Sequence, residues 1–163
     1  MRRLWIVRHA KAEPAGPGTS DAVRPLSAKG CADAARAGAV LAPVFPGATA
    51  VSAATRTVQT AQALARAAGI PSDALDVRSD GYLADARAWW EWVSTFEDAH
   101  SSGLVVGHNP GVSAFVELLT GMRWEMPTCG MVEVELPDRP WSDLAAGTGK
   151  VRAVWTPSST LHG

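Results

Sequence analysis

The sequence contains little cysteine, carries almost no net charge, and lacks a long hydrophobic run. Its two cysteines, Cys31 and Cys129, stand far apart and outside any C-x-x-C pattern. This excludes a disulfide scaffold and a cysteine-rich zinc site, and it predicts a reducing, cytoplasmic location. The four histidines are scattered along the chain, so we expect no metal site. A formal net charge of −1 gives no electrostatic reason to expect nucleic acid or a membrane as a partner.

The apolar run near the start of the chain is also short. It covers residues 4–7 and stops at Arg8, so it is much shorter than the h-region of a signal peptide. No other run approaches the roughly 18 residues that a membrane-spanning helix needs. A length of 163 residues without a linker or a repeat predicts one domain over residues 1–163. Nothing in the sequence calls for more than a monomer.

Short apolar runs alternate with longer alanine-rich stretches, which is typical of a layered α/β fold. Residues 4–7 form a continuous apolar run, as expected of a parallel strand buried on both faces. We expect further strands at 48–52, 75–78 and 104–106, and edge strands at 131–136 and 151–155. Helices are expected from the Ser27 cap to Leu41, over 56–68, over 86–96, and from an Asn109 cap to Leu119, with Pro110 in the first turn.

The segment 86–96 is rich in tryptophan. Trp89, Trp92 and Phe96 recur at helical spacing, so we interpret these side chains, together with Trp90, as helix packing and not as a shelf for substrate. Two histidines, His100 in a polar loop and His162 near the chain end, are expected to be exposed surface residues.

Four potentially cationic side chains follow three of the expected strands. Arg8 and His9 come directly after the first strand, Arg56 follows the second, and His108 follows the strand at 104–106. Open α/β sheets bind ligands at the carboxyl ends of their strands, where helix N-termini also favour anions. Such a cluster of positive charge needs an anion between its members. Phosphate fits best, because arginine binds it through paired hydrogen bonds.

The two histidines predict chemistry as well as binding. A neutral imidazole at His9, held by a rigid strand, can attack phosphorus and form a phosphohistidine intermediate. A second donor beside the transferring group, His108, would stabilise charge on the phosphoryl oxygens, with Arg8 and Arg56 holding the phosphate. This interpretation needs neither a metal ion nor a cofactor.

Three motifs occur in order along the chain. The stretch L-W-I-V-R-H-A-K-A at 4–12, R-T-V-Q-T-A at 56–61 and V-V-G-H-N-P-G at 105–111 resemble the signature motifs of the histidine phosphatase superfamily. The segments D-A-V-R-P-L-S at 21–27 and M-P-T-C-G at 126–130 resemble its SixA-type branch, which dephosphorylates phosphohistidine on signalling proteins. The resemblance implies a three-layer α/β/α sandwich with a mostly parallel sheet and one antiparallel edge. It also implies His9 as nucleophile and Arg8, Arg56 and His108 as the phosphate pocket.

The chain departs from the superfamily pattern at two points. Ala10 stands where glycine is usual, and its methyl group could narrow the approach of the backbone to phosphate. The larger members also carry a glutamate that protonates an alkoxide leaving group, whereas the corresponding region here offers only Asp80 and Asp85 as candidates for a general acid. Asp85 is equally suited to cap the helix at 86–96. Arg24 is a candidate fourth cationic contact, with loop ordering as the alternative.

These features favour a phosphatase acting on phosphohistidine of a signalling protein, because a protonated imidazole can leave without an enzyme acid. Inorganic phosphate would be the product. A small-molecule phosphomonoesterase of the same fold is the first alternative. A non-catalytic module that binds phosphate or phosphoproteins is the second.

Overall fold

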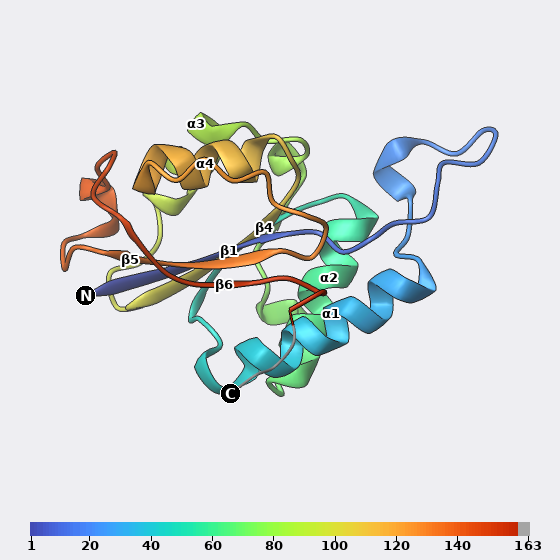
Figure 1. Cartoon of the computed structure of the whole chain (residues 1–163), viewed down its shortest axis with the longest axis horizontal. Coiled ribbons are helices and arrows are strands. Elements are labelled where there is room, and N and C mark those ends of the chain that lie inside the picture. The colour runs from blue at the N-terminus through green and yellow to red at the C-terminus, as the bar shows by residue number, and fades with distance from the viewer. Residues whose placement is uncertain (160–163) are drawn as a thin grey trace.

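The computed structural model describes residues 1–159 and contains a central mixed sheet of six strands (Figure 1). The strands are β1 (Arg2–Arg8), β2 (Ala48–Ser52), β3 (Val77–Arg78), β4 (Ser102–Gly107), β5 (Met131–Leu136) and β6 (Lys150–Trp155). Their order is β3-β2-β4-β1-β5-β6. The first four strands in this order are parallel to one another, whereas β5 is antiparallel to both of its neighbours, β1 and β6. The expected mostly parallel sheet with one antiparallel edge is therefore confirmed.

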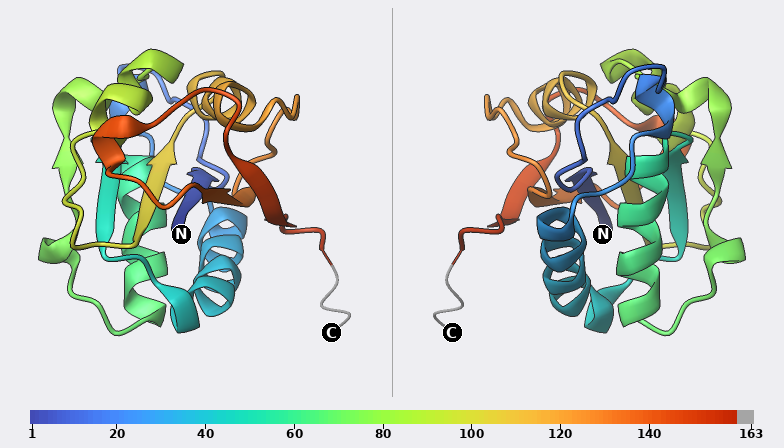
Figure 2. Two further views of the ribbon diagram at one scale, coloured as in Figure 1. Left: turned by 90° about the vertical axis from the view of Figure 1, so that its left-hand side faces the viewer. Right: turned by 90° about the vertical axis from the view of Figure 1, so that its right-hand side faces the viewer.

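Four α-helices cover the two faces of this sheet. They are α1 (Ala28–Leu41), α2 (Thr55–Ala67), α3 (Ala86–Val93) and α4 (Gly111–Thr120). Figures 1 and 2 show α1 and α2 on one face and α3 and α4 on the other. Alternation along β1 explains the two layers, since Trp5 and Val7 belong to the core under α1 and α2, whereas Leu4 and Ile6 belong to the core under α3 and α4.

Local capping defines two of the helix starts. The Ser27 side chain accepts a hydrogen bond from Gly30 N at 3.0 Å and begins α1, as the sequence predicts. Asp85 begins α3 in the same way, with 2.9 Å between its Oδ1 and Ala88 N. The helix α3 ends at Val93, three residues before the expected end at Phe96.

The expected Asn109 cap of α4 is wrong. The helix begins at Gly111, one residue later, and Pro110 occupies the N-cap position. The Asn109 side chain instead donates from Nδ2 to the carbonyl oxygen of Met126 and accepts from Ser113 Oγ. These tertiary partners replace the backbone N–H groups that a cap residue would bind.

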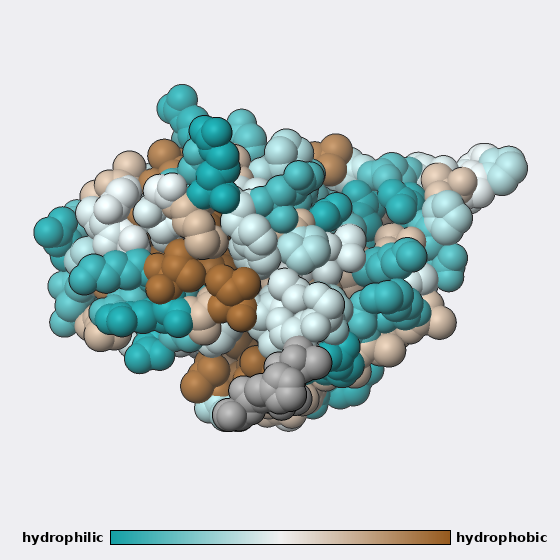
Figure 3. Space-filling model, viewed as in Figure 1, coloured by the Kyte–Doolittle hydropathy of each residue, from teal (hydrophilic) through white to brown (hydrophobic). Residues whose placement is uncertain are grey.

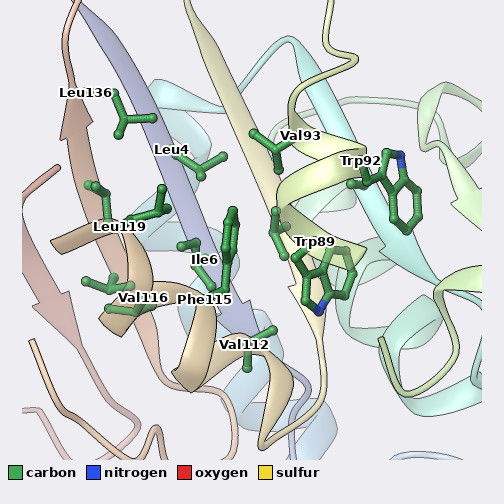
Figure 4. Close-up of a cluster of buried hydrophobic side chains, with 14 of the residues drawn as sticks. Leu4, Ile6, Trp89, Trp92, Val93, Val112, Phe115, Val116, Leu119 and Leu136 are labelled. Carbon is green, nitrogen blue, oxygen red and sulfur yellow. The ribbon is translucent and has the colours of Figure 1, made fainter. Parts of the chain in front are cut away.

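The tryptophans of α3 pack in the core, as the sequence predicts (Figure 4). Trp89 and Trp92 are buried and stack on each other with ring centroids 5.3 Å apart, and Trp90 packs against the same cluster. A Cβ atom on Gly107 would lie 2.4 Å from the Trp89 ring, so only glycine admits this contact. The indole thereby supports the end of β4, the strand that leads into His108.

Within residues 1–159, no helix has both the length and the apolar character needed to cross a bilayer. The face seen in Figure 3 is mostly hydrophilic or of intermediate hydropathy, with hydrophobic residues left of its centre, below it and at the upper edge. This face therefore offers no extended apolar surface.

Candidate active site

The carboxyl ends of β1, β2 and β4 bring the four predicted residues together. Arg8 ends β1 and is followed by His9, His108 follows β4, and Arg56 is the second residue of α2, just beyond the end of β2. The rings of His9 and His108 lie 5.3 Å apart between centroids. His9, Arg56 and His108 are only 8%, 4% and 3% exposed, so the cluster is held in the protein and not on flexible surface arms.

A backbone contact defines the chemical state of His9. Its Nδ1 lies 2.7 Å from the carbonyl oxygen of Ala10, and a carbonyl can only accept. The Nδ1 atom must therefore carry the proton, which leaves the lone pair on Nε2. This is the tautomer that a nucleophilic histidine needs.

The loop at 126–130 holds Arg8 and His9 from the side. Arg8 Nη1 donates to the carbonyl oxygen of Met126 at 2.9 Å, and Cys129 N donates to the carbonyl oxygen of His9 at 2.9 Å. Cys129 adopts φ 61°, a left-handed conformation that is uncommon without glycine. The contacts explain why this segment accompanies the arginine–histidine pair. They also leave Arg8 Nε buried without a hydrogen-bond partner within residues 1–159.

A hydroxyl chain defines the tautomer of His108. Thr57 Oγ1 donates to the carbonyl oxygen of Ser52 at 2.6 Å, so it accepts the proton of Ser52 Oγ at 3.0 Å. Ser52 Oγ is then the acceptor for His108 Nε2–H at 2.9 Å. The remaining ring nitrogen, Nδ1, is buried and has no partner in the described part of the chain. Ser52 and Thr57 were not recognised as site residues from the sequence.

Both histidines are held in the neutral form. Burial is the main cause that lowers the pKa of His9 to about 4 and that of His108 to about 3. The positive charges of Arg8 and Arg56 add to both shifts. At neutral pH both rings are therefore uncharged imidazoles, and His9 keeps a lone pair on Nε2.

These pKa shifts predict a loss of stability in mild acid. Between the lowered values and the usual histidine pKa near 6.5, the unfolded chain binds more protons than the folded protein, so stability falls as the pH falls below about 6.5. For a fall from pH 6.5 to 5.5 we expect each histidine to contribute at most about 1 kcal/mol to this loss. Urea unfolding at both pH values measures the change in the free energy of unfolding. His108→Gln keeps a donor for Ser52 and should show a smaller loss than the wild type; equal losses would contradict the assignment.

Arg56 is oriented by an acidic residue, Asp21, whose role the sequence does not predict. Its Nη1 donates to the carbonyl oxygen of Asp21 at 2.9 Å, and its Nη2 donates to Asp21 Oδ2 at 3.0 Å. The hydroxyl of Tyr82 donates to the same Oδ2 at 2.5 Å, and the Tyr82 ring lies edge-on to His108. Asp21 therefore links a loop after β1 to the pocket. Its place in the SixA-like segment at 21–27 is the one sequence signal that could have indicated it.

Arg24 lies in the same network. Its Nε donates to the carbonyl oxygen of Glu13 at 2.8 Å, and its Nη1 donates to Asp21 Oδ1 at 2.9 Å. These contacts order the loop, whereas its charge also helps to lower the pKa of His9. A phosphate contact by Arg24 stays a prediction.

The R-x-x-Q-T-A segment has a further structural basis. Thr60 Oγ1 accepts from Ala10 N at 3.0 Å, and Gln59 Oε1 accepts from Leu26 N at 2.8 Å. One helix face thus positions Arg56, the His9 loop and the loop that carries Asp21. Ala10 itself is fully buried and does not have a positive φ, so its methyl group introduces no backbone strain.

The two candidates for a general acid lie in different surroundings. The Asp85 carboxylate caps α3, as described above. Asp80 is exposed and lines a surface hollow with Arg78, Glu91 and Trp92. No hydrogen bond or ion pair between described residues links either one to His9 or His108. An acid role for them stays untested.

The described residues contain no group of three or more histidine, cysteine or acidic side chains that could hold a metal ion. The positive charge of the pocket comes from Arg8 and Arg56. His162 lies outside the described residues, and His100 is partly buried at the opposite end of β4.

Comparisons with known proteins identify proteins of similar sequence and fold. The model of the histidine phosphatase superfamily (branch 1) matches residues 4–80, a range that includes the motifs at 4–12 and 56–61. A protein assigned as the phosphohistidine phosphatase SixA of Agrobacterium tumefaciens has 26% identity and a TM-score of 0.81, over 96% of this chain and 98% of that one. The histidine phosphatase SixA complexed with tungstate has 23% identity and a TM-score of 0.79, over 95% and 97% of the two chains.

The fold extends to proteins named for other substrates. A protein assigned as an α-ribazole-5′-phosphate phosphatase of Escherichia coli has 14% identity and a TM-score of 0.71, over 96% and 98% of the two chains. The comparison with curated proteins gives no significant match.

Proposed function

We infer that this chain is a phosphatase of the histidine phosphatase superfamily, and we propose that it hydrolyses phosphohistidine on a signalling protein through a covalent intermediate on His9. The observation that carries the proposal is the 2.7 Å contact between His9 Nδ1 and the carbonyl oxygen of Ala10. It leaves Nε2 unprotonated in a pocket that Arg8 and Arg56 make positive. A lone imidazole on a surface would have neither property.

In the first step, the phosphoryl group of the substrate binds between Arg8, Arg56 and His108. His9 Nε2 attacks phosphorus and forms an N–P bond, while the bond from phosphorus to the leaving group breaks and its electron pair moves to that group. The arginines stabilise the charge on the phosphoryl oxygens. We expect the bound phosphoryl group to raise the pKa of His108, so that Nδ1 takes up a proton and donates as well. The proton stays on His9 Nδ1 and keeps its hydrogen bond to the Ala10 carbonyl, so the phosphorylated ring carries a positive charge until the N–P bond breaks in the second step.

In the second step, a water molecule attacks the phosphorus on His9. The N–P bond breaks, inorganic phosphate leaves, and the electron pair returns to Nε2. The same arginines hold the phosphoryl oxygens in both steps. Because Arg8 and Arg56 supply the positive charge, we propose that the reaction needs no metal ion.

Two features favour phosphohistidine over phosphate esters. The leaving nitrogen of a protonated phosphohistidine departs as neutral imidazole, whereas an alkoxide needs a general acid. The Asp85 carboxylate already caps α3, and Asp80 has no hydrogen bond to His9 or His108 among the described residues. The two SixA structures named above provide the second support, because their names describe phosphohistidine phosphatases. The fold alone does not choose the substrate, since it is shared with the Escherichia coli protein.

A substrate panel tests the proposal. We expect the wild type to hydrolyse a phosphohistidine peptide with a kcat/KM well above that for phosphoserine or a sugar phosphate. Substrate labelled in the phosphoryl group, followed by an alkaline quench that preserves phosphohistidine, should label wild type and not His9→Ala. Faster turnover of sugar phosphates would favour a small-molecule phosphomonoesterase. Anion binding without turnover of any substrate would favour a binding module.

A further inference from the structure

An acidic side chain in a pocket built for an anion needs an explanation. Asp21 accepts hydrogen bonds from Arg56, Arg24 and Tyr82, yet its side chain stays 47% exposed. Its charge opposes the entry of a phosphate dianion beside Arg56. Orientation of Arg56 alone would be served by the backbone carbonyl of residue 21, which already accepts from Arg56 Nη1 at 2.9 Å. The carboxylate therefore adds something that the backbone contact does not.

We propose that Asp21 selects a phosphorylated imidazole, by accepting a hydrogen bond from the ring nitrogen of the substrate that is not bound to phosphorus. This inference rests on the proposed function and names the residue that makes the site specific for phosphohistidine. Tyr82 is the positioning residue in this arrangement, because its hydroxyl holds Asp21 Oδ2 at 2.5 Å.

The location of Asp21 suits the leaving group. In an in-line displacement, the attacking and leaving atoms lie on opposite sides of phosphorus. His9 is 8% exposed and attacks from the floor of the pocket, at the end of the buried strand β1, so the leaving group points outward. The Asp21 side chain is about half exposed and Tyr82 is partly exposed, and the Tyr82 ring lies edge-on to His108 with 5.8 Å between centroids.

The chemistry of Asp21 suits an imidazole and not an alkoxide. Hydrogen bonds from Tyr82 and Arg24 hold the pKa of Asp21 well below its usual range, so the group is an acceptor and cannot serve as an acid. A fixed carboxylate raises the pKa of a neighbouring imidazole nitrogen and keeps it protonated. When the P–N bond breaks, its electron pair stays on the leaving nitrogen, and the ring departs neutral with its proton on the nitrogen facing Asp21.

An ester leaves with the opposite charge. The oxygen of an alkyl or aryl phosphate becomes negative as the bond to phosphorus breaks, and the charge of Asp21 would oppose this. The same side chain thus favours one class of leaving group and disfavours the other.

The Asp21→Asn variant tests the inference, because asparagine keeps an oxygen for Arg56 and removes the charge. We expect kcat/KM for a phosphohistidine peptide to fall about 10- to 100-fold, the usual range for a lost hydrogen bond to a charged group. For p-nitrophenyl phosphate, whose leaving group needs no proton, kcat/KM should fall by a much smaller factor or rise. The alkaline limb of phosphohistidine hydrolysis should also move to lower pH. Tyr82→Phe should lower the ratio of kcat/KM for the phosphohistidine peptide to kcat/KM for p-nitrophenyl phosphate as well, by a smaller factor.

Asp73→Asn is the matched control, since Asp73 is exposed in the 3-10 turn Ser72–Ala74 and should leave both activities unchanged. If Asp21→Asn lowered kcat/KM equally for both substrates, Asp21 would only orient Arg56, and the inference would be overturned. An unchanged substrate ratio would overturn it as well. Labelling of wild-type His9 by phosphohistidine is measured in parallel: without that label the proposed function fails, whereas with it only the role of Asp21 is in question.

Discussion

Replacing His9 with alanine is expected to lower kcat for phosphohistidine by at least about 10⁴-fold, the range seen when a covalent nucleophile is removed. We expect His108 not to replace it, because its Nε2 is engaged by Ser52 and the ring follows a different strand. Single-turnover kinetics with excess enzyme measures this loss directly. Binding of tungstate, with its charge like that of phosphate, should persist through Arg8 and Arg56.

The matched control for this variant is His100→Ala. His100 is partly buried beside the start of β4, at the end of the sheet opposite the pocket, and should retain wild-type kcat. A His9→Ala enzyme that folds, binds tungstate and keeps kcat within tenfold of wild type would contradict the nucleophile assignment.

Replacing Arg56 with alanine is expected to lower kcat by about 10³-fold or more, as for other arginines that stabilise a transferring phosphoryl group. The side chain is 4% exposed and donates to Asp21 through both terminal nitrogens. Its removal takes one positive charge from the pocket and leaves the Asp21 carboxylate without that partner. Both changes oppose the binding of an anionic transition state.

Two further variants sharpen this test. Arg56→Lys keeps the charge and loses the planar fork, so we expect it to recover only a minor part of the activity. Arg87→Ala removes an exposed arginine of α3 that pairs with Glu91, and it should leave kcat unchanged. Steady-state kinetics with phosphohistidine measures kcat for all three variants. A small effect of Arg56→Ala on kcat would contradict the role of Arg56 in binding the phosphoryl group.

The four central residues could be located from the sequence because each follows a recognisable strand. Buried parallel strands appear as short apolar runs, and parallel strands bring their carboxyl ends to one edge of the sheet. Arg8, His9 and His108 follow such runs directly. This reasoning requires only the order of the elements, not the details of packing.

Asp21 and Tyr82 could not be located in the same way. They lie 61 residues apart, and each belongs to a short 3-10 segment or its boundary, where no hydrophobic periodicity exists. Their contact depends on how two loops fold over the strand ends. The predicted Asn109 cap is wrong for a related reason. Its sequence context suits a helix cap, but its side chain binds the Met126 carbonyl and the Ser113 hydroxyl in place of the backbone N–H groups of the helix.

The most direct measurement is identification of the phosphorylated atom during turnover. Wild-type protein is mixed with substoichiometric phosphohistidine peptide, quenched in alkali within the first turnover, and analysed by mass spectrometry and phosphorus NMR. The structure predicts one alkali-stable, acid-labile phosphoryl group on Nε2 of His9, because Nδ1 is engaged by Ala10 at 2.7 Å. Complete hydrolysis of the peptide with no phosphoryl group on His9 at any quench time, or with the group on His108, would contradict the account.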